Sequence, residues 1–335
     1  MYYTPTMITI PKLQEEHLSP EKKREVIKQI KYWKEKRNAL IIAHNYQIPG
    51  IQDVADYVGD SLELARKAAE VDNELLVFCG VHFMAESAKI FSPEKTVLIP
   101  DLKAGCSLAS SIDAEELRKW KRRYPKALVV SYVNTTAEVK AESDYCVTSS
   151  NAVRVVNSIP ENREIIFLPD MFLGDYVARK TGRKNFYVYP GECHVHAKST
   201  AADIRKKLGR HPTAQFLIHP ECGCVSECMH YVATKAIPEE RTHILSTSGM
   251  VNYAKESPTD KFIVATETGM LHRLKKENPK KKFLPLRNDM VCEFMKMITL
   301  EKLLNSLKNL EFEVNVDHEI AKKARLPIER MLAIG

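Results

Sequence analysis

The chain has 335 residues, of which 44% are hydrophobic and 28% are charged, and its formal net charge is +7. This composition excludes a disordered chain and is sufficient for two or three domains with their own cores. The Lys and Arg residues are spread over amphipathic stretches, which favours a solvated surface over nucleic-acid binding and suits small anionic substrates.

Membrane insertion and export are not expected from the sequence. No apolar run approaches the roughly 20 residues that a membrane span needs. The first 16 residues lack the basic region and apolar stretch of a signal peptide. We therefore expect a cytoplasmic protein, in whose reducing surroundings cysteines more often serve metal binding or catalysis than disulfides.

The first predicted unit begins with a Lys- and Arg-rich helix, whose start is marked by Ser19-Pro20-Glu21. An apolar run from Ala39 follows and ends in the polar residues His44-Asn45-Tyr46. Further strand-like runs cover residues 74–79 and 96–100. The first unit is thus predicted to be a helix followed by alternating strands and helices.

The second predicted unit repeats this order. A helix start at Asp113, with Glu116 in its first turn, precedes an apolar run from Ala127 that ends at Tyr132 and Asn134. Strand-like runs then cover residues 164–168 and 185–189.

The third predicted unit again opens with a capped helix, at Thr200 with Asp203. Its apolar run starts at Ala214 and ends in His219-Pro220-Glu221. The strand-like runs that follow it cover residues 243–245, 261–265 and 282–286.

The first strands of the three units occur at nearly constant spacing. Ala127 lies 88 residues after Ala39, and Ala214 lies 87 residues after Ala127. Strands alternating with helices indicate parallel sheets covered on both faces. We therefore predict an α/β fold of three similar three-layer α/β/α units around a pseudo-threefold axis. The expected boundaries are 1–110 with the N-terminal helix, 111–198, and 199–335 with a C-terminal helical segment.

Three of the eight cysteines occupy equivalent places in these units. Cys106, Cys193 and Cys292 each follow the last predicted strand of a unit and precede a helix start, at Asp113, Thr200 and Thr299. Loops at the carboxyl ends of parallel strands form the ligand crevice in such folds. If the units face one another, the three cysteines meet at the centre; the alternative is three unrelated cysteines in surface loops.

Three thiolates with a vacant fourth position fit either catalytic zinc or a 4Fe-4S cluster with one iron left to substrate. An open metal position polarises a bound hydroxyl or carboxylate, which is the chemistry of condensation and dehydration. The sequence separations of the cysteines do not decide between the two metals.

Polar residues at the same strand ends and at helix starts complete the predicted crevice. Hydroxyls and helix N-termini suit carboxylate or phosphate groups. Glu221 is the only acid at the ends of the three first strands, which favours it as the general acid or base. The candidates are His44, Tyr46, Tyr132, Asn134, His219 and Glu221, with Ser61, Ser149 and Thr247 near helix starts or turns.

The motifs, in their order and spacing, resemble the quinolinate synthase family, 4Fe-4S enzymes of de novo NAD biosynthesis. The resemblance extends from residue 41 to residue 304. It is carried by His44-Asn45-Tyr46, Gly59-Asp60-Ser61-Leu62, Ala104-Gly105-Cys106-Ser107-Leu108-Ala109, Ser131-Tyr132-Val133-Asn134, Thr148-Ser149-Ser150-Asn151-Ala152, His219-Pro220-Glu221-Cys222, Ser246-Thr247-Ser248-Gly249-Met250 and Met295-Lys296-Met297-Ile298-Thr299-Leu300.

The resemblance implies a transferase that condenses iminoaspartate with dihydroxyacetone phosphate to quinolinate, losing phosphate and two waters, with the cluster as Lewis acid. An aspartate oxidase or an aspartate dehydrogenase would supply the imine. By position, Cys106, Cys193 and Cys292 would be the cluster ligands. Tyr46, Tyr132 and Glu221 would transfer protons, Tyr132 and Glu221 also contacting substrate. The remaining substrate contacts would be His44, Ser61, Asn134, Ser149, His219 and Thr247, with His196 near the phosphate.

Two features depart from the family pattern. Cys222, Cys224 and Cys228 are extra cysteines, and the segment that follows them up to Ser246 is longer than expected. Cys292 is followed by Glu293-Phe294-Met295, where members commonly have other residues before the Met-Lys-Met run. Two alternatives stay open: a zinc hydrolase or lyase using Cys106, Cys193 and Cys292, and a redox sensor or iron-sulfur scaffold using the extra cysteines.

Overall fold

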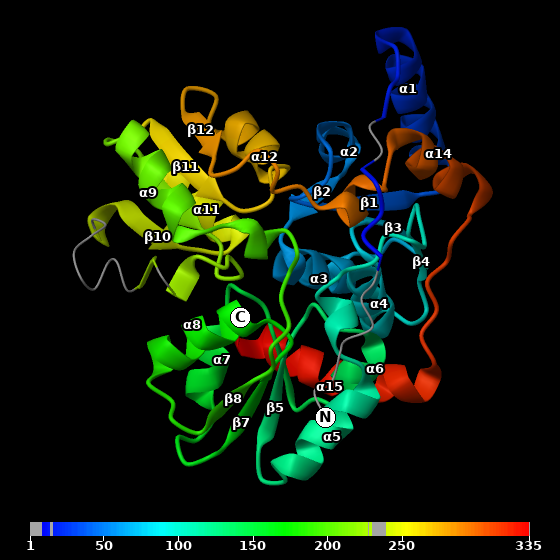
Figure 1. Ribbon diagram of the computed structural model, residues 1–335. Helices are drawn as coiled ribbons and strands as arrows, with labels where there is room; N and C mark the ends of the chain where they lie inside the picture. The colour runs from blue at the N-terminus through cyan, green and yellow to red at the C-terminus, as the bar shows by residue number, and fades with distance from the viewer. Residues whose placement is uncertain (1–8, 14–15, 227, 230–238, 335) are drawn as a thin grey trace.

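Three four-stranded parallel sheets form the scaffold (Figure 1). The computed structural model describes residues 9–13, 16–226, 228–229 and 239–334. Most of the N-terminal stretch examined for a signal peptide, and residues 230–238 of the long segment after the extra cysteines, lie outside the described residues. In Figure 1 the sheets belong to three lobes that surround a common centre.

The first sheet has the strand order β2-β1-β3-β4. Helix α1 (Pro20–Lys36) precedes it, with the Ser19 hydroxyl accepting from the Lys22 N–H as its N-cap. The strands are β1 (Ala39–His44), β2 (Tyr57–Gly59), β3 (Leu75–Cys79) and β4 (Thr96–Leu98), and the helices between them are α2 (Pro49–Val54), α3 (Ser61–Glu70) and α4 (His82–Phe91).

The second sheet has the equivalent order β6-β5-β7-β8. Helix α5 (Ala114–Arg123) leads into it from its N-cap Asp113. The strands are β5 (Leu128–Tyr132), β6 (Tyr145–Val147), β7 (Ile165–Leu168) and β8 (Phe186–Val188), joined by α6 (Ala137–Ala141), α7 (Ala152–Ser158) and α8 (Met171–Thr181).

The third sheet repeats the pattern as β10-β9-β11-β12. Helix α9 (Ala201–Arg210) precedes it, and Thr200 and Asp203 form a capping box at its start. The strands are β9 (Gln215–Ile218), β10 (Thr242–Ile244), β11 (Lys261–Ala265) and β12 (Lys282–Pro285), and the helices are α11 (Thr247–Glu256), α12 (Met270–Glu277) and the short α13 (Glu293–Lys296).

The predicted α/β class and the three similar units are confirmed, as are the three helix caps. The sequence analysis missed two strands, β2 and β6. Each is a three-residue edge strand with a partly exposed pattern, so neither has the apolar run that marks the buried inner strands β3 and β7.

The shared strand order fixes where a site can form. In each sheet the second strand lies on one side of the first strand, and the third and fourth strands lie on its other side. The direction in which strands are added therefore reverses beside β1, β5 and β9. Ligand crevices form at the carboxyl ends of strands at such a reversal. We propose that the units 1–110, 111–198 and 199–335 are related by a pseudo-threefold axis through these ends, which superposition of the three sheets would test.

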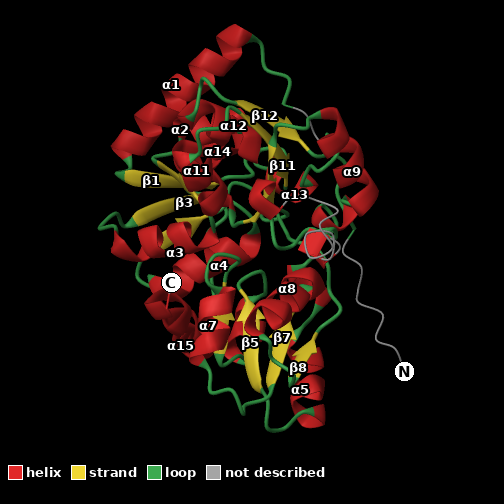
Figure 2. Cartoon of the chain, turned by 90° about the vertical axis from the view of Figure 1, so that its left-hand side faces the viewer, coloured by secondary structure: helices red, strands yellow, loops and turns green. Residues whose placement is uncertain are grey.

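The last two helices leave the third sheet and cover the other two units. Helix α14 (Leu300–Asn309) packs against α1 and β3, whereas α15 (His318–Ile334) packs against α6 and β6. Figure 2 shows α15 beside α7. Asn151 Nδ2 donates to the Met331 carbonyl at 2.9 Å, and Arg66 donates to the Leu332 carbonyl at 3.0 Å. The C-terminal segment thus joins the first two units.

No helix in the described part of the chain combines the length and the hydropathy needed to cross a bilayer.

Helix α15 offers a direct stability test. Ile328 on this helix is 0% exposed, while Leu326 is 51% exposed. Replacing Ile328 by Ala leaves a cavity beneath α15 and should lower the free energy of unfolding by about 2–5 kcal/mol. Leu326→Ala, the matched control, should change it by less than about 0.5 kcal/mol. Urea unfolding measures both, and equal effects would contradict the packing described.

Candidate active site

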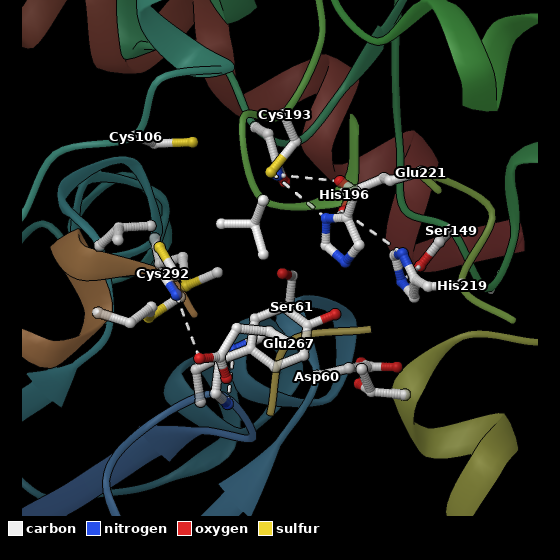
Figure 3. Close-up of a pocket in the computed structure, with 18 of the residues that line it drawn as sticks. Asp60, Ser61, Cys106, Ser149, Cys193, His196, His219, Glu221, Glu267 and Cys292 are labelled. Carbon is white, nitrogen blue, oxygen red and sulfur yellow. Dashed lines mark hydrogen bonds and ion pairs between the residues drawn. The ribbon is translucent and has the colours of Figure 1, made fainter. Parts of the chain in front are cut away.

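A buried cavity lies where the carboxyl ends of the three sheets meet, and it encloses about 630 Å³, its mouth included (Figure 3). Every residue that the sequence analysis proposed for the site lines it. These are His44, Tyr46, Ser61, Cys106, Tyr132, Asn134, Ser149, Cys193, His196, His219, Glu221, Thr247 and Cys292.

The three cysteines come from loops of three different sheets. Cys106 follows β4, Cys193 follows β8, and Cys292 is the N-cap residue of α13, after β12. In Figure 3 they lie on one side of the pocket, and Ser149 and His219 lie on the opposite side. The sulfurs thus gather on one side of the cavity, where His196 Nδ1 lies 3.3 Å from Cys193 Sγ and joins them to the polar groups opposite.

The separation of the sulfurs bears on the choice of metal. Among the described residues, the group of three potential ligands whose ligating atoms all lie within 4.8 Å of one another is His196, His219 and Glu221. The three cysteine sulfurs do not form such a group. A single tetrahedral zinc ion, with Zn–S bonds of about 2.3 Å, needs sulfurs roughly 3.8 Å apart. The wider spacing disfavours one zinc ion and suits the larger body of an iron-sulfur cluster.

Burial keeps these thiols protonated in the absence of a cation. Desolvation raises the pKa of Cys106 to about 11 and that of Cys292 to about 12. The pKa of Cys193 is raised well above its usual value, first by burial and then by the charge of Glu221. The nucleophilic and ligating form is the thiolate, so metal binding at this site has to displace protons from the sulfurs.

Glu221 is the centre of the polar side of the cavity. Asn134 Nδ2 donates to its Oε1 at 3.3 Å, and His196 Nδ1 lies 3.1 Å from its Oε2. His219 Nδ1 lies 3.3 Å from the same Oε2, while its Nε2 lies 3.1 Å from the Ser149 hydroxyl. These residues come from the second and third units, so the carboxylate joins the two.

The neighbours of Glu221 hold it in the ionised form. Burial alone would raise the pKa of this carboxyl, but His196, His219 and the Tyr132 hydroxyl together lower it to about 2. Burial lowers the pKa of His196 to about 4 against the opposing attraction of Glu221. At neutral pH the cavity thus holds a carboxylate beside a neutral His196 imidazole, the pair of states required of a base with an adjacent proton carrier.

The two tyrosines are hydrogen-bond donors at all physiological pH values. Burial and the charge of Glu221 raise the pKa of both Tyr46 and Tyr132 well above 10. The Tyr46 hydroxyl lies 2.5 Å from Thr266 Oγ1, which also lies 2.9 Å from His196 Nε2. Thr266 therefore links Tyr46 to His196 at the end of β11.

Two polar atoms of the lining have no hydrogen-bond partner in the described part of the chain. Asn134 Oδ1 and His219 Nδ1 are both buried, and the contact of His219 Nδ1 with Glu221 is not a well-directed hydrogen bond. Buried polar groups are nearly always satisfied in folded proteins, so orphaned ones in a cavity point to a missing ligand.

Two helices direct their N-termini at the site. Ser61 is the first residue of α3 and Thr247 is the first residue of α11. Arg273 Nη1 donates to Asn45 Oδ1 at 2.7 Å, and Asn45 Nδ2 donates to Thr247 Oγ1 at 2.8 Å. Thr247 is thus held in place from the first unit, and both helix starts suit an anionic group.

The sequence analysis missed Glu267, which is fully buried and lines the cavity. Its Oε1 accepts from the Cys292 N–H at 3.2 Å and lies 2.8 Å from Lys296 Nζ. Its Oε2 accepts from the Gly269 N–H at 2.7 Å. The residue follows a predicted strand, 261–265, so searching the ends of all inner strands rather than the first strand of each unit would have found it. Its partners position the Cys292 loop.

The extra cysteines lie away from the cavity. Cys222, Cys224 and Cys228 are fully buried in the core of the third unit, and none of them lines the cavity. Cys222 Sγ donates to the Ala265 carbonyl at 3.0 Å, and the Ser199 hydroxyl donates to Cys224 Sγ at 3.5 Å. The thiols also contact one another: hydrogen bonds with Cys222 and Cys228 lower the pKa of Cys224 well below its usual value, while burial raises that of Cys222.

Comparison with known proteins gives a family match along most of the chain. The model of the family described as "Quinolinate synthetase A protein" matches residues 28–333. The quinolinate synthase of a Thermus thermophilus strain is 56% identical over 302 residues, which cover 90% of this chain and 95% of the relative. Those of Mycobacterium sp. strain KMS and of a Mycobacterium tuberculosis strain are 54% and 53% identical over 299 residues, covering 89% of this chain and 89% and 86% of the relatives.

Burial of His44 should make stability depend on pH. Desolvation lowers its pKa from 6.5 to about 3, so between these values the unfolded state binds more protons. Stability should therefore fall as pH decreases from about 6.5 towards 3. The variant His44→Asn keeps an acceptor for the Tyr46 N–H. It should reduce the slope of the unfolding free energy against pH in this range by up to about 1.4 kcal/mol per pH unit.

Chemical unfolding of the metal-free protein at several pH values measures this dependence. His318, whose side chain is 88% exposed, provides the control, since His318→Asn should leave the slope unchanged. An unaltered slope in His44→Asn would contradict the assignment.

Proposed function

The chain belongs to the quinolinate synthetase A family, and from this premise we propose that it condenses iminoaspartate with dihydroxyacetone phosphate to quinolinate, with loss of phosphate and two waters. The observation that supports this most is that all the residues proposed from the sequence line one buried cavity. Its three cysteines, its ionised Glu221 beside a neutral imidazole and its orphaned polar atoms suit a small, multiply anionic substrate.

Cys106, Cys193 and Cys292 would hold a 4Fe-4S cluster on the sulfur side of the cavity. The wide spacing of the sulfurs and the chemistry of a three-thiol set support this group over zinc. When bound, the cluster supplies a Lewis acid that polarises a hydroxyl or carboxylate of the substrate. Glu267 keeps the Cys292 loop in position through the Cys292 N–H.

The opposite side of the cavity binds and orients the substrates. His44, Asn134 and His219 are suited to contact the carboxylates, and the Asn134 Oδ1 atom, which has no partner among the described residues, can accept a hydrogen bond from a substrate. The hydroxyls of Ser61, Ser149 and Thr247, at or near helix starts, are suited to the same groups, and His196 to the phosphate. The low exposure of these groups excludes water, which strengthens each contact.

Glu221 is proposed as the base that removes a carbon-bound proton. It is ionised at neutral pH, and His196 Nδ1 lies 3.1 Å from the oxygen that would receive the proton. The phenols of Tyr46 and Tyr132 remain protonated and can donate to oxygens that gain charge. Tyr46 is coupled to His196 through Thr266, which gives a path for moving a proton along the site.

We further propose that the protein acts in the cytoplasm. The structure contains no disulfide among its eight cysteines, all of which lie in the described residues, and a reducing compartment would keep the ligand thiols available. An aspartate oxidase or an aspartate dehydrogenase would supply iminoaspartate, because an imine hydrolyses in water and has to be made where it is used.

Replacing Cys106, Cys193 or Cys292 by Ala should each abolish cluster incorporation, since two thiolates leave a second iron without a protein ligand. Iron and sulfide analysis after anaerobic reconstitution measures this. The matched control replaces Cys222, Cys224 and Cys228 by Ser and should retain full iron and activity. Near-stoichiometric iron in the first three variants would contradict the ligand assignment, and loss of iron in the control would assign the extra cysteines a metal role.

Glu221→Gln keeps the shape of the side chain and an acceptor for Asn134 but removes the base. Turnover should fall roughly 10²- to 10⁴-fold, whereas cluster content and substrate binding should persist. Steady-state kinetics, iron analysis and substrate titration separate these quantities. Near-full turnover, or loss of the cluster, would rule out this role and leave Tyr46 or Tyr132 as the better candidate.

A further inference from the structure

The residues that follow the three proposed ligand cysteines form a hydrogen-bonded chain of their own. Ser107 follows Cys106, His194 follows Cys193, and Glu293 follows Cys292. Ser107 Oγ lies 2.6 Å from His194 Nδ1, and His194 Nε2 lies 2.8 Å from Glu293 Oε2. We call this chain the Ser107–His194–Glu293 belt.

The donor and acceptor atoms of the belt match one another. A carboxylate only accepts hydrogen bonds, so His194 Nε2–H donates to Glu293. In the neutral imidazole, Nδ1 then accepts from the Ser107 hydroxyl. One imidazole thus ties its own loop to the loop after β4 and to the loop after β12.

The belt lies outside the reacting volume. The three cysteines line the cavity, whereas Ser107, His194 and Glu293 do not. The side chains of His194 and Glu293 are 14% and 19% exposed, which places them near the surface of the cysteine loops. Because Ser107 does not face the cavity, it is not placed as a nucleophile towards a substrate there, although a Ser–His–Glu chain occurs in hydrolases.

We propose that the belt is a positioning device, which holds the three cysteine loops together and slows the loss of the cluster. This inference rests on the proposed cluster ligation. Cys106, Cys193 and Cys292 are far apart in sequence and belong to three sheets, so no local chain connection keeps them near one another. Hydrogen bonds beyond the ligands themselves orient such ligands, and their removal typically weakens metal binding roughly 10- to 100-fold.

Residues at the start of α13 surround the central imidazole of the belt. Glu293 Oε2 lies 2.8 Å from His194 Nε2. Phe294 packs edge-on against the His194 ring, with centroids 6.0 Å apart. Glu293 and Phe294 therefore supply an acceptor and an apolar wall for this imidazole.

The test measures iron release from the reconstituted holoprotein to a ferrous chelator, under anaerobic conditions. Ser107→Ala breaks the Ser107–His194 bond, Glu293→Ala breaks the His194–Glu293 bond, and His194→Gln removes the imidazole that makes both. Each variant should begin with full iron content and then release iron roughly 10- to 100-fold faster than the parent protein. Ser107→Thr retains a hydroxyl and should restore slow release.

Two further variants make the result specific. Ser107→Ala combined with His194→Gln should release iron no faster than the faster single variant, because both changes remove the same bond. His272→Gln is the matched control: His272 Nε2 lies 3.0 Å from Asp53 Oδ1 and also joins the third unit to the first, but neither residue lines the cavity. Its release rate should equal that of the parent.

The possible failures are distinguishable. Release at the parent rate in Ser107→Ala and Glu293→Ala overturns the belt proposal, as does equal acceleration in His272→Gln, since any contact between units would then serve. A parent protein that takes up no cluster overturns the proposed function instead. A lowered unfolding temperature of the metal-free variants, without faster iron release, assigns the belt a general structural role and also overturns the proposal.

Discussion

The site depends on enclosure by three sheets. In a parallel sheet, ligand-binding side chains lie at the carboxyl ends of the strands, and the strand ends of one sheet alone cannot surround a substrate. Three sheets with the same strand order, each reversing beside its first strand, bring three such ends to one centre. Each sheet contributes a cysteine and strand-end polar groups to the lining of the cavity. Enclosure and chemistry thus arise from the same arrangement.

Burial of the cavity residues then determines which of them are charged. Burial raises the pKa of the thiols and phenols and lowers that of His44 and His196, so these groups are neutral at physiological pH. Glu221 is the exception among them, because hydrogen bonds and imidazole neighbours outweigh its desolvation. A cavity with an ionised carboxylate and protonated thiols binds a metal group only as the thiols lose their protons, which couples metal binding to proton release.

Much of this site could be predicted from the sequence because it lies at the ends of long apolar runs, which are the strongest local signals in a parallel fold. The helix caps Ser19, Asp113 and Thr200 were equally visible. Strands β2 and β6 were not visible, since each has only three residues, too few to show a periodicity. Glu267 was overlooked because only first strands were compared. Amphipathicity predicts that α15 has an apolar face but not which unit that face covers.

The units are joined by two kinds of contact with different consequences. Helix α15 packs against α6 and β6 of the second unit and against α4 of the first, and Arg66 of the first unit donates to the Leu332 carbonyl, so burial and one hydrogen bond together join these two units. The third unit meets its neighbours at the cavity through directional hydrogen bonds, among them Asn45 with Thr247 and Ser149 with His219. Apolar burial tolerates small displacements, whereas hydrogen bonds do not. At the cavity, the position of the third unit, which carries Glu221 and Cys292, therefore depends on Ser149, His219 and Thr247, which are also proposed to contact the substrate.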